Sequence, residues 1–407
     1  MEFLKIDDVQ VAFDKLLACA GHMLKVEEVA IENALGKVVA KDLFANEDLP
    51  NFRKSSVDGY AVLYNDTASA SDSSPVFLSN IGKISIGEAV EDEINSGQCI
   101  DIPTGGMLPK NANAIVMMEY TEVFGSDIAI NEPVAMLENV VEIGDDIKKG
   151  NLLIKKGKKI TPQDIGALAA MGITVIPTFK ALKIGIISTG NELVHPNANV
   201  PMGKIRDISS YSIAALAKKS SMDVIRLELL QDDIEIIQTA MQNNFKDCDI
   251  VAISGGSSYG KADLTAKIIS KIADPGIFTH GIAIKPGKPT ILAYDSLSDT
   301  AIIGLPGHPV SAMVVFELLV IGFIKKVTNQ EEGTFITAKL TVNIPSDAGK
   351  LTFYPCVLKY KDNEYKATPI SFKSSLITSL TKADGYFLIN KEKEGLKENE
   401  IVKVILF

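Results

Sequence analysis

The stretch CDIVAISGGSSYGKAD, from Cys248 to Asp263, decides how the second half of the chain is organised. It begins with the apolar run CDIVAIS, which predicts a buried strand, and the residues after Asp263 are helix-like. Two adjacent glycines, Gly255 and Gly256, follow the predicted strand, so the backbone there passes close to another group. A tight turn and a phosphate cradle both use such glycines, and this stretch by itself leaves the two readings open.

The same alternation of strands and helices extends over residues 182–327. The strands are continuous apolar runs, which is typical of a parallel sheet covered by helices on both faces. In chain order, these runs are LKIGIIS (182–188), DVIRLELL (223–230), CDIVAIS (248–254), FTHGIAI (278–284), TILAY (290–294) and AIIGL (301–305). A long helix from Pro309 to Lys326 completes the pattern, so residues 181–328 are expected to form an α/β domain.

Two other parts of the chain show the alternation of half-buried β-strands. Residues 46–138 contain short β-type runs separated by turn residues at intervals of about ten residues, which predicts a small all-β module. Residues 334–407 return to alternating strands after the acidic linker TNQEEG, and they are expected to form a small C-terminal β-barrel or sandwich.

The remaining segments, residues 1–45 and 139–180, are expected to form a helical connector. In the second of them Thr161 is a helix cap, Pro162 occupies the first helical position and Gly172 ends the helix. Because such segments lie on both sides of the all-β module, we interpret that module as an insertion into the connector.

Composition narrows the class of protein. A length of 407 residues is enough for about two to four domains. The formal charge of −10 disfavours nucleic-acid binding, and no apolar run approaches the length needed to cross a membrane. The N-terminus has no basic segment followed by an apolar one, so we expect a cytoplasmic protein. Four scattered cysteines without a CxxC pair argue against a zinc site or a disulfide framework.

The strand ends of the predicted sheet are the candidate ligand site, because open α/β sheets bind ligands beyond the carboxyl ends of their strands. Four of the five ends carry glycine, several precede a helix and one carries two lysines, a combination that favours anions. The segments are TGNEL (189–193), QDD (231–233), GGSSYGKAD (255–263), KPGKP (285–289) and PGHPVSA (306–312). The chain lacks GxxxxGK[ST], which excludes a P-loop, and the lack of GxGxxG weakens a dinucleotide-binding reading.

Three carboxylates, those of Glu192, Asp232 and Asp263, fall at this same edge of the sheet. Acids beside a phosphate cradle would repel the ligand unless a divalent cation lies between them, and Mg²⁺ is the usual solution. The alternative is that Asp232 and Asp263 cap the helices that follow them. Glu192 precedes no predicted helix start, so capping does not explain it.

Eight motifs in fixed order make the chain similar to a known family. They are SSVDGYAV (55–62), IPTGGMLPKNANAIVMMEY (102–120), GDDIKKGNLLIKKGKKITPQDIGALAAMGI (144–173), ISTGNELV (187–194), GKIRDISSY (203–211), SGGSSYGKAD (254–263), IKPGKP (284–289) and GLPGHPVSA (304–312). Over almost its whole length the chain resembles the molybdopterin molybdenumtransferases, called MoeA in bacteria and the gephyrin E-domain in animals. The resemblance implies an α/β molybdopterin-binding domain with the inserted module and connector described above, and a β-barrel for residues 334–407.

The resemblance also implies an activity and partners. Molybdate would be inserted into adenylylated molybdopterin, the pyrophosphate bond would be cleaved and AMP released, with Mg²⁺ as cofactor and molybdate as substrate. It implies an elongated homodimer, in which each active site forms between the α/β domain of one subunit and the β module of the other. The molybdopterin adenylyltransferase would be a further partner.

By motif position, the resemblance implies functional roles for several groups of residues. The catalytic residues would be Asp58, Thr104, Asp146, Glu192, Asp232, Asp263 and Lys285. Glu192, Asp232 and Asp263 would be the metal ligands. The ligand-binding residues would be Thr189, Gly190, Ser254, Gly255, Gly256, Ser257, Gly260, Lys288, Pro306, Gly307, Ser311 and Ser374. Asp58 and Thr104 have a plainer reading as turn residues, and His308, where the family usually has Asn, is interpreted as a polar loop residue.

Several basic residues of the family pattern are missing from this chain, so a second hypothesis, a protein that binds the substrate without turning it over, stays open. Val141, Gly281 and Pro355 stand where the family typically has a basic side chain, and Asp101 also replaces an arginine. The lysines that could compensate are Lys261, Lys288, Lys350 and Lys373. The alternative to the enzyme is therefore a catalytically impaired paralogue that binds molybdopterin or its adenylylated form as a carrier. Adenylylation of molybdopterin is a third reading, disfavoured by the inserted module and the barrel.

Overall fold

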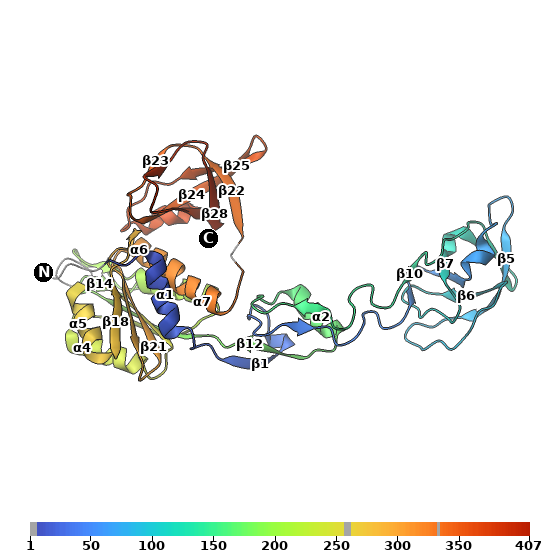
Figure 1. The fold of residues 1–407 in the computed structure, drawn as a ribbon, viewed down its shortest axis with the longest axis horizontal. Coiled ribbons are helices and arrows are strands. Elements are labelled where there is room, and N and C mark those ends of the chain that lie inside the picture. The colour runs from blue at the N-terminus through green and yellow to red at the C-terminus, as the bar shows by residue number, and fades with distance from the viewer. Residues whose placement is uncertain (1–5, 256–261, 332–333) are drawn as a thin grey trace.

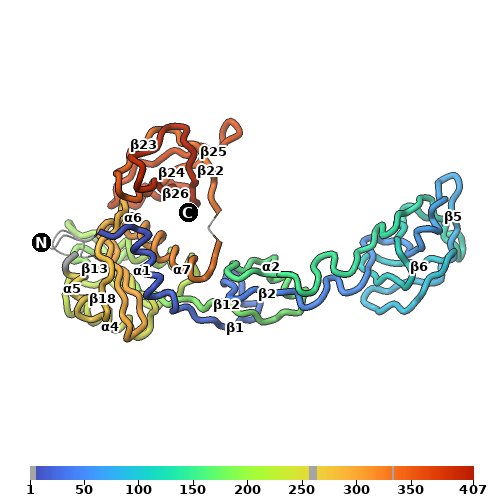
Figure 2. Tube along the Cα trace, in the orientation of Figure 1, coloured from blue at the N-terminus to red at the C-terminus, as the bar shows by residue number. Residues whose placement is uncertain are grey.

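The computed structural model describes residues 6–255, 262–331 and 334–407 (Figure 1). The chain is strongly elongated. The α/β domain and the C-terminal barrel lie together at one end, the β module lies at the other, and the connector spans the distance between them (Figure 2).

The α/β domain is built on a six-stranded sheet of order β16-β13-β17-β21-β20-β18. Its strands are β13 (Lys183–Thr189), β16 (Asp223–Leu230), β17 (Ile250–Ser254), β18 (Pro275–His280), β20 (Ile291–Asp295) and β21 (Thr300–Leu305). The first four strands in the order are parallel, as predicted. β20 runs antiparallel to both of its neighbours, β21 and β18, because β20 and β21 are joined by a short turn at residues 296–299 that only an antiparallel pair permits.

Helices cover both faces of this sheet. They are α3 (Ser209–Lys219), α4 (Ile234–Asn244), α5 (Ala262–Ile272), α6 (Pro309–Val315) and α7 (Gly322–Val327), and a π-helical segment, Phe316–Ile321, joins α6 to α7. One face packs on α3, α6 and α7, and the other on α4 and α5. The N-terminal helix α1 (Val9–Ala20) also packs on this domain, where its buried Ala12 and Leu16 share a core with Phe323. No helix in the described ranges is long and apolar enough to cross a membrane.

The inserted module is a six-stranded sheet of order β7-β4-β6-β5-β9-β8. Its strands are β4 (Gly59–Val62), β5 (Val76–Lys83), β6 (Gln98–Ile102), β7 (Ala114–Met117), β8 (Thr121–Phe124) and β9 (Asp127–Ile130). Neighbouring residues of β4 bury their side chains on opposite faces, Tyr60 in one small core and Ala61 in another. This explains why β4 is buried along its whole length and carries no charged residue.

The connector consists of paired short strands and one helix, α2 (Pro162–Ala170). The antiparallel pairs are β1 (Val26–Ala30) with β12 (Val175–Phe179), β2 (Leu43–Phe44) with β11 (Leu152–Ile154), and β3 (Lys54–Ser55) with β10 (Val140–Val141). As predicted, Thr161 caps α2 and Pro162 is its first residue. Thr161 and Asp164 form a capping box, and Gly172 has a φ of 65° just beyond the helix.

This capping box provides a stability prediction. Asp164 is buried, accepts hydrogen bonds from the backbone and hydroxyl of Thr161 at 3.0 and 2.8 Å, and pairs with Lys158. We expect Asp164→Ala to lower the free energy of unfolding of the connector by about 1–2 kcal/mol, measured by thermal melting. The exposed neighbour Gln163 provides the control, since Gln163→Ala should leave the melting curve nearly unchanged. Equal effects of the two variants would contradict the assignment.

The C-terminal domain is a closed barrel, as predicted. Five strands, β24-β25-β22-β28-β26, form a continuous sheet, and the pairing of β26 with β24 closes it. They are β22 (Phe335–Leu340), β24 (Leu351–Lys361), β25 (Glu364–Pro369), β26 (Gly385–Ile389) and β28 (Ile401–Leu406), with a small pair of β23 (Ile344–Pro345) and β27 (Gly395–Leu396) beside them. The α/β domain joins this barrel directly, because its β19 (Ile284–Lys285) pairs with β24.

Candidate functional site

A cavity of about 820 Å³ lies at the carboxyl ends of β13, β17 and β21, between the α/β domain and loops of the barrel. Ten of the residues named from the sequence line it together: Thr189, Glu192, Ser254, Gly255, Lys285, Lys288, Pro306, Gly307, Ser311 and Ser374. Gly190 and Asp232 lie in the loops that adjoin this wall. The ends predicted after β13, β17 and β21 therefore converge on one space, which the barrel helps to enclose. The predicted strand over residues 278–284 is wrong, because β18 ends at His280 and the KPGKP segment reaches the cavity from β19, which pairs with the barrel strand β24.

Packing between two strand ends accounts for the first glycine of the quoted stretch. Gly255 has a φ of 126°, and a Cβ atom there would lie 2.1 Å from the carbonyl oxygen of Thr189. A Cβ at Gly190 would lie 2.9 Å from Oε1 of Glu192. The adjoining positions Gly256, Ser257, Gly260 and Lys261 lie outside the described residues.

The acidic end of the site is built by two neighbouring loops. Asn191 links them, because its backbone N–H donates to Oδ2 of Asp232 at 3.4 Å and its Oδ1 accepts from the backbone N–H of Asp232 at 3.1 Å. The exposed carboxylate of Glu192 lies in the same loop as Asn191 and lines the cavity. Asp263 lies at the start of α5, but its side chain is outside the described part of the structure.

The helix-capping alternative for Asp232 is wrong. Asp233 is the N-cap of α4, and its Oδ1 accepts from the backbone N–H groups of Glu235 at 2.9 Å and Ile236 at 3.0 Å. The two adjacent aspartates therefore have different roles. Asp233 caps the helix, and Asp232 is hydrogen-bonded to the loop that carries Glu192. Among the described side chains, which do not include that of Asp263, no three His, Cys, Asp or Glu residues are grouped to hold a metal ion by themselves.

Asp207, which the sequence reading did not single out, lies on the wall of the same cavity and is only 4 % exposed. Its Oδ1 accepts from the hydroxyl of Ser188 at 3.1 Å and from the backbone N–H of Ser210 at 3.2 Å, and its Oδ2 accepts from the Ser210 hydroxyl. The signal in the sequence was an acid followed by two serines where α3 starts, a pattern also expected of an ordinary helix start. Its burial at the cavity distinguishes it from a surface cap.

The basic end of the site joins the α/β domain to the barrel. Nζ of Lys285 lies 3.1 Å and Nζ of Lys350 lies 3.3 Å from Oδ2 of Asp347. The hydrogen bond from Lys285, followed by that from Lys350, lowers the pKa of Asp347 below its usual range. The ionised carboxylate thus stabilises this contact at neutral pH, and the contribution is lost as the pH falls through that lowered pKa.

Only some of the lysines that could compensate for the missing basic residues lie at the cavity. Lys288 and Lys350 are among the described residues that line the cavity, and Lys373 is not. Pro355, at a position where the family typically has arginine, is buried in β24 of the barrel. The cavity therefore has lysines from two domains. None of them occupies the position of the missing arginine, where this chain has Pro355.

His308 and Ser374 form a second link across the cavity. His308 is the N-cap residue of α6, and its Nδ1 lies 2.8 Å from Oγ of Ser374 in the barrel loop. The backbone N–H of Val310 donates to the carbonyl oxygen of Ser374 at 3.1 Å. The structure thus gives His308 a positioning contact with a residue that lines the site.

The other three residues implied by the resemblance lie at the far end of the molecule (Figure 1). Asp58 precedes β4 and Thr104 follows β6, and these two strands are paired. The backbone N–H and hydroxyl of Thr104 donate to Oδ1 of Asp58 at 2.7 and 2.9 Å, which lowers the pKa of Asp58. Asp146 is exposed near the base of the module, where its N–H donates to the carbonyl of Leu49. One chain does not bring these acids to the cavity.

A cavity lined by lysines, hydroxyls and carboxylates is typical of enzymes that bind phosphorylated or other anionic substrates. Comparison with known families agrees with this class. The MoeA N-terminal region (domain I and II) matches residues 8–172, a probable molybdopterin binding domain matches residues 185–326, and the MoeA C-terminal region (domain IV) matches residues 337–407.

Individual relatives and solved structures extend this similarity over the whole chain. A putative molybdopterin biosynthesis protein of Methanocaldococcus jannaschii is 34% identical over 98% of this chain and 96% of its own length. The molybdopterin molybdenumtransferase of Bacillus subtilis is 30% identical over 94% of this chain and 90% of its own. The crystal structure of a molybdopterin biosynthesis MoeA protein from Pyrococcus horikoshii superposes with a TM-score of 0.84 at 30% identity, covering 99% of this chain and all of the other. The chain therefore belongs to the MoeA family, the molybdopterin molybdenumtransferases of molybdenum cofactor biosynthesis.

Proposed function

We propose that the chain inserts molybdate into adenylylated molybdopterin and releases AMP in a reaction that depends on Mg²⁺. The observation that carries this proposal is the single cavity that combines Glu192 and Asp207 with Lys285, Lys288 and Lys350. Attack of an oxyanion on a phosphoanhydride requires neutralisation and orientation of charge more than covalent catalysis, and this cavity offers both.

The basic end is suited to anions. Lys285 and Lys350 are held in place by Asp347, while the hydroxyls of Ser311 and Ser374 add neutral donors on the same wall. Charge-assisted hydrogen bonds from such lysines are each worth about 1.5–3 kcal/mol when the ligand is well ordered. We therefore assign molybdate and the phosphate of the pterin to this half of the cavity.

The acidic end is suited to Mg²⁺ that is shared with the substrate. Glu192 and Asp232 offer carboxylate oxygens from adjoining loops, and Asp263 is assigned to the same set from its motif position. Mg²⁺ commonly takes one or two carboxylates together with phosphate oxygens and water, so this donor set fits it. When bound, it would neutralise charge on the pyrophosphate. The backbone N–H of Asn191, which donates to Oδ2 of Asp232, would keep that carboxylate oriented for this purpose.

We further propose that the site is completed by a second copy of the chain. Asp58, Thr104 and Asp146 lie on the distal module, separated from the cavity by the length of the connector (Figure 1). A homodimer would allow the module of one subunit to reach the cavity of the other, and this would bring Asp58, Thr104 and Asp146 to the substrate as the motif assignment requires. The carboxylate of Asp58, whose pKa is lowered by hydrogen bonds from Thr104, would hold a cation or accept from a substrate N–H.

The direct test is an assay of the purified chain with adenylylated molybdopterin, molybdate and Mg²⁺. We expect AMP to appear and to depend on both molybdate and the metal. Free molybdopterin with ATP serves as the control substrate, and formation of adenylylated molybdopterin from it would contradict the proposal. Tight binding of adenylylated molybdopterin without AMP release would support the impaired paralogue instead.

One observation favours that second candidate. Asp347 contacts both Lys285 and Lys350, so part of the positive charge at the basic end is already neutralised. We expect Asp347→Asn to tighten binding of molybdate about three- to tenfold, because a negative charge beside two ligand lysines is removed. Calorimetric titration with molybdate measures this, with Asp362→Asn in the exposed β24–β25 turn as the control. Weaker binding would show that Asp347 is needed chiefly to position the lysines.

A further inference from the structure

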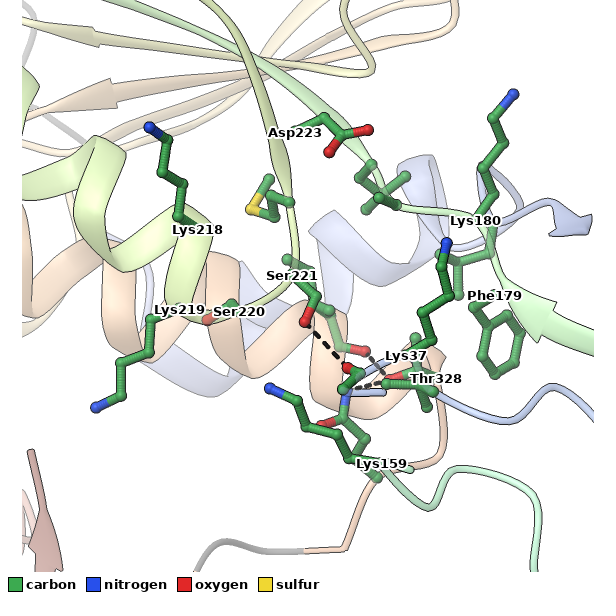
Figure 3. A pocket seen from close by; sticks show the side chains of 18 of the residues that line it. Lys37, Lys159, Phe179, Lys180, Lys218, Lys219, Ser220, Ser221, Asp223 and Thr328 are labelled. Atoms are coloured by element: carbon green, nitrogen blue, oxygen red, sulfur yellow. Dashed lines mark hydrogen bonds between the residues drawn. The ribbon is translucent and has the colours of Figure 1, made fainter. Parts of the chain in front are cut away.

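A second cavity, of about 380 Å³, lies at the joint between the connector and the α/β domain (Figure 3). One wall is formed by connector segments at residues 35–38 and 179–182 together with Lys159. The facing wall is the end of α3 and the turn after it, residues 218–223, with side chains from the end of α7 closing the space. The residues of this cavity, which we call the joint cavity, are different from those that line the substrate cavity.

The joint cavity is strongly basic although the chain as a whole is acidic, at −10. Five lysines line it: Lys37, Lys159, Lys180, Lys218 and Lys219. One acid, Asp223, is also on the wall, and Glu27 pairs with Lys37 at 2.6 Å. In the part of the chain that the structure describes, no carboxylate lies within ion-pair distance of the other four lysines. Their charge is therefore available to a ligand.

Helix ends explain only part of this cluster. Lys218 and Lys219 occupy the last turn of α3, where lysines commonly offset the helix dipole. Lys37, Lys159 and Lys180 come from the connector, at positions where no helix ends. Figure 3 shows Lys218 and Lys219 on one side of the cavity, with Lys37, Lys180 and Phe179 on the other. Two separate parts of the fold thus line one space with lysines, although Lys218 and Lys219 point away from each other in this view and would have to turn toward the cavity to reach a ligand.

The remaining wall is apolar or carries hydroxyl groups. Leu24, Leu182, Met222 and Ile324 provide apolar surface, and the half-buried ring of Phe179 provides an aromatic contact. Next to them lie the hydroxyls of three residues, Ser220, Ser221 and Thr328. Small-molecule sites commonly combine such apolar walls with a few polar groups that fix orientation. The pattern suits a ligand with one flat apolar part and one dianionic part.

We propose that the joint cavity binds a phosphate monoester of nucleotide size, at a site separate from the substrate cavity. The lysines would hold the phosphate, and the apolar wall with Phe179 would receive the ring system. The ligand would touch the connector and the α/β domain at once, where the hydroxyl of Ser221 already donates across the joint to the carbonyl oxygen of Gly36 at 3.3 Å. Its binding would therefore fix the angle at which the distal module is carried.

The test is calorimetric titration with AMP at low ionic strength, using the full-length chain. Because AMP can also enter the substrate cavity, the titration is repeated in the variant Lys285→Ala/Lys288→Ala, where binding at the joint cavity should persist. Adding Lys159→Ala or Lys219→Ala to that background should weaken AMP binding at least about tenfold each. Adenosine should not bind measurably, and inorganic phosphate should bind more weakly than AMP.

A matched control separates a specific site from general positive charge. Lys326 is an exposed lysine in the last turn of α7 and does not line the joint cavity. Lys326→Ala should leave AMP binding unchanged, and melting curves should show that every variant is folded. Loss of all AMP binding in Lys285→Ala/Lys288→Ala would overturn the proposal, as would equal losses in Lys326→Ala and Lys159→Ala. Neither result depends on turnover, so the proposed transferase activity stands or fails separately.

Discussion

Replacing one carboxylate by an amide, in Glu192→Gln, is expected to lower the rate of AMP release at least about 100-fold. The physical reason is that Glu192 lines the cavity at its acidic end and lies exposed over Gly190, where a carboxylate contributes little to packing. The change removes a negative charge and keeps the shape of the side chain. We therefore expect the melting temperature to stay within about two degrees of the unmodified protein.

The measurement is AMP release at saturating adenylylated molybdopterin, repeated over a range of Mg²⁺ concentrations. A loss of metal affinity should appear as partial rescue at high Mg²⁺, which a purely structural defect would not show. Glu235→Gln is the matched control, because Glu235 is an exposed acid on α4 whose side chain does not line the cavity. Normal turnover in Glu192→Gln, or a melting temperature lowered by many degrees, would contradict the assigned role.

Much of the fold could be predicted because the two sheet types leave different patterns in the sequence. Strands β13, β17 and β21 are covered on both faces by helices, so they read as continuous apolar runs. The antiparallel direction of β20 was not predicted. A buried strand has the same apolar sequence pattern in either direction, and only the short turn to β21 requires the two strands to be antiparallel. Closure of the barrel depends on the pairing of β24 with β26, which no local pattern encodes.

The site was predictable where the residues lie at the ends of strands. Thr189, Ser254 and Pro306 follow three parallel neighbours, so their convergence is a consequence of topology. Asp232 and Asp233 are adjacent acids of the same type, and only the hydrogen bonds show which one caps α4. The sequence therefore predicted that this loop belongs to the site, but it could not show which of the two aspartates faces the site and which caps the helix.

The contacts that the barrel makes could not be predicted from local pattern. Lys285 and Asp347 are separated by 62 residues, and His308 and Ser374 by 66. Neither Asp347 nor His308 lies in a pattern that predicts a partner so far along the chain. The lysine cluster of the joint cavity has the same origin, since Lys37 and Lys219 come from segments about half the chain apart. Such sites exist only after the domains have docked.

A mixture of two inactive variants should recover activity if each site is shared between two subunits. Asp58 and Glu192 lie at opposite ends of one chain, so Asp58→Asn and Glu192→Gln should each be inactive as homodimers. Co-expression makes about half of the dimers mixed, and each mixed dimer then has one site with both acids intact and one with neither. About a quarter of the unmodified activity should return.

The pattern of recovery identifies which end of the chain supplies which acid. Co-expressing Asp58→Asn with Asp146→Asn should recover nothing, because both changes lie on the same end of the chain and every shared site would keep one of them. If Asp58 and Glu192 instead served one site within a single chain, each mixed dimer would carry one defect per site, and the first pair would also stay inactive. Size-exclusion chromatography with light scattering establishes that the mixed species are dimers. Recovery near a quarter in the first pair, with none in the second, would thus place the distal carboxylates at the partner's cavity.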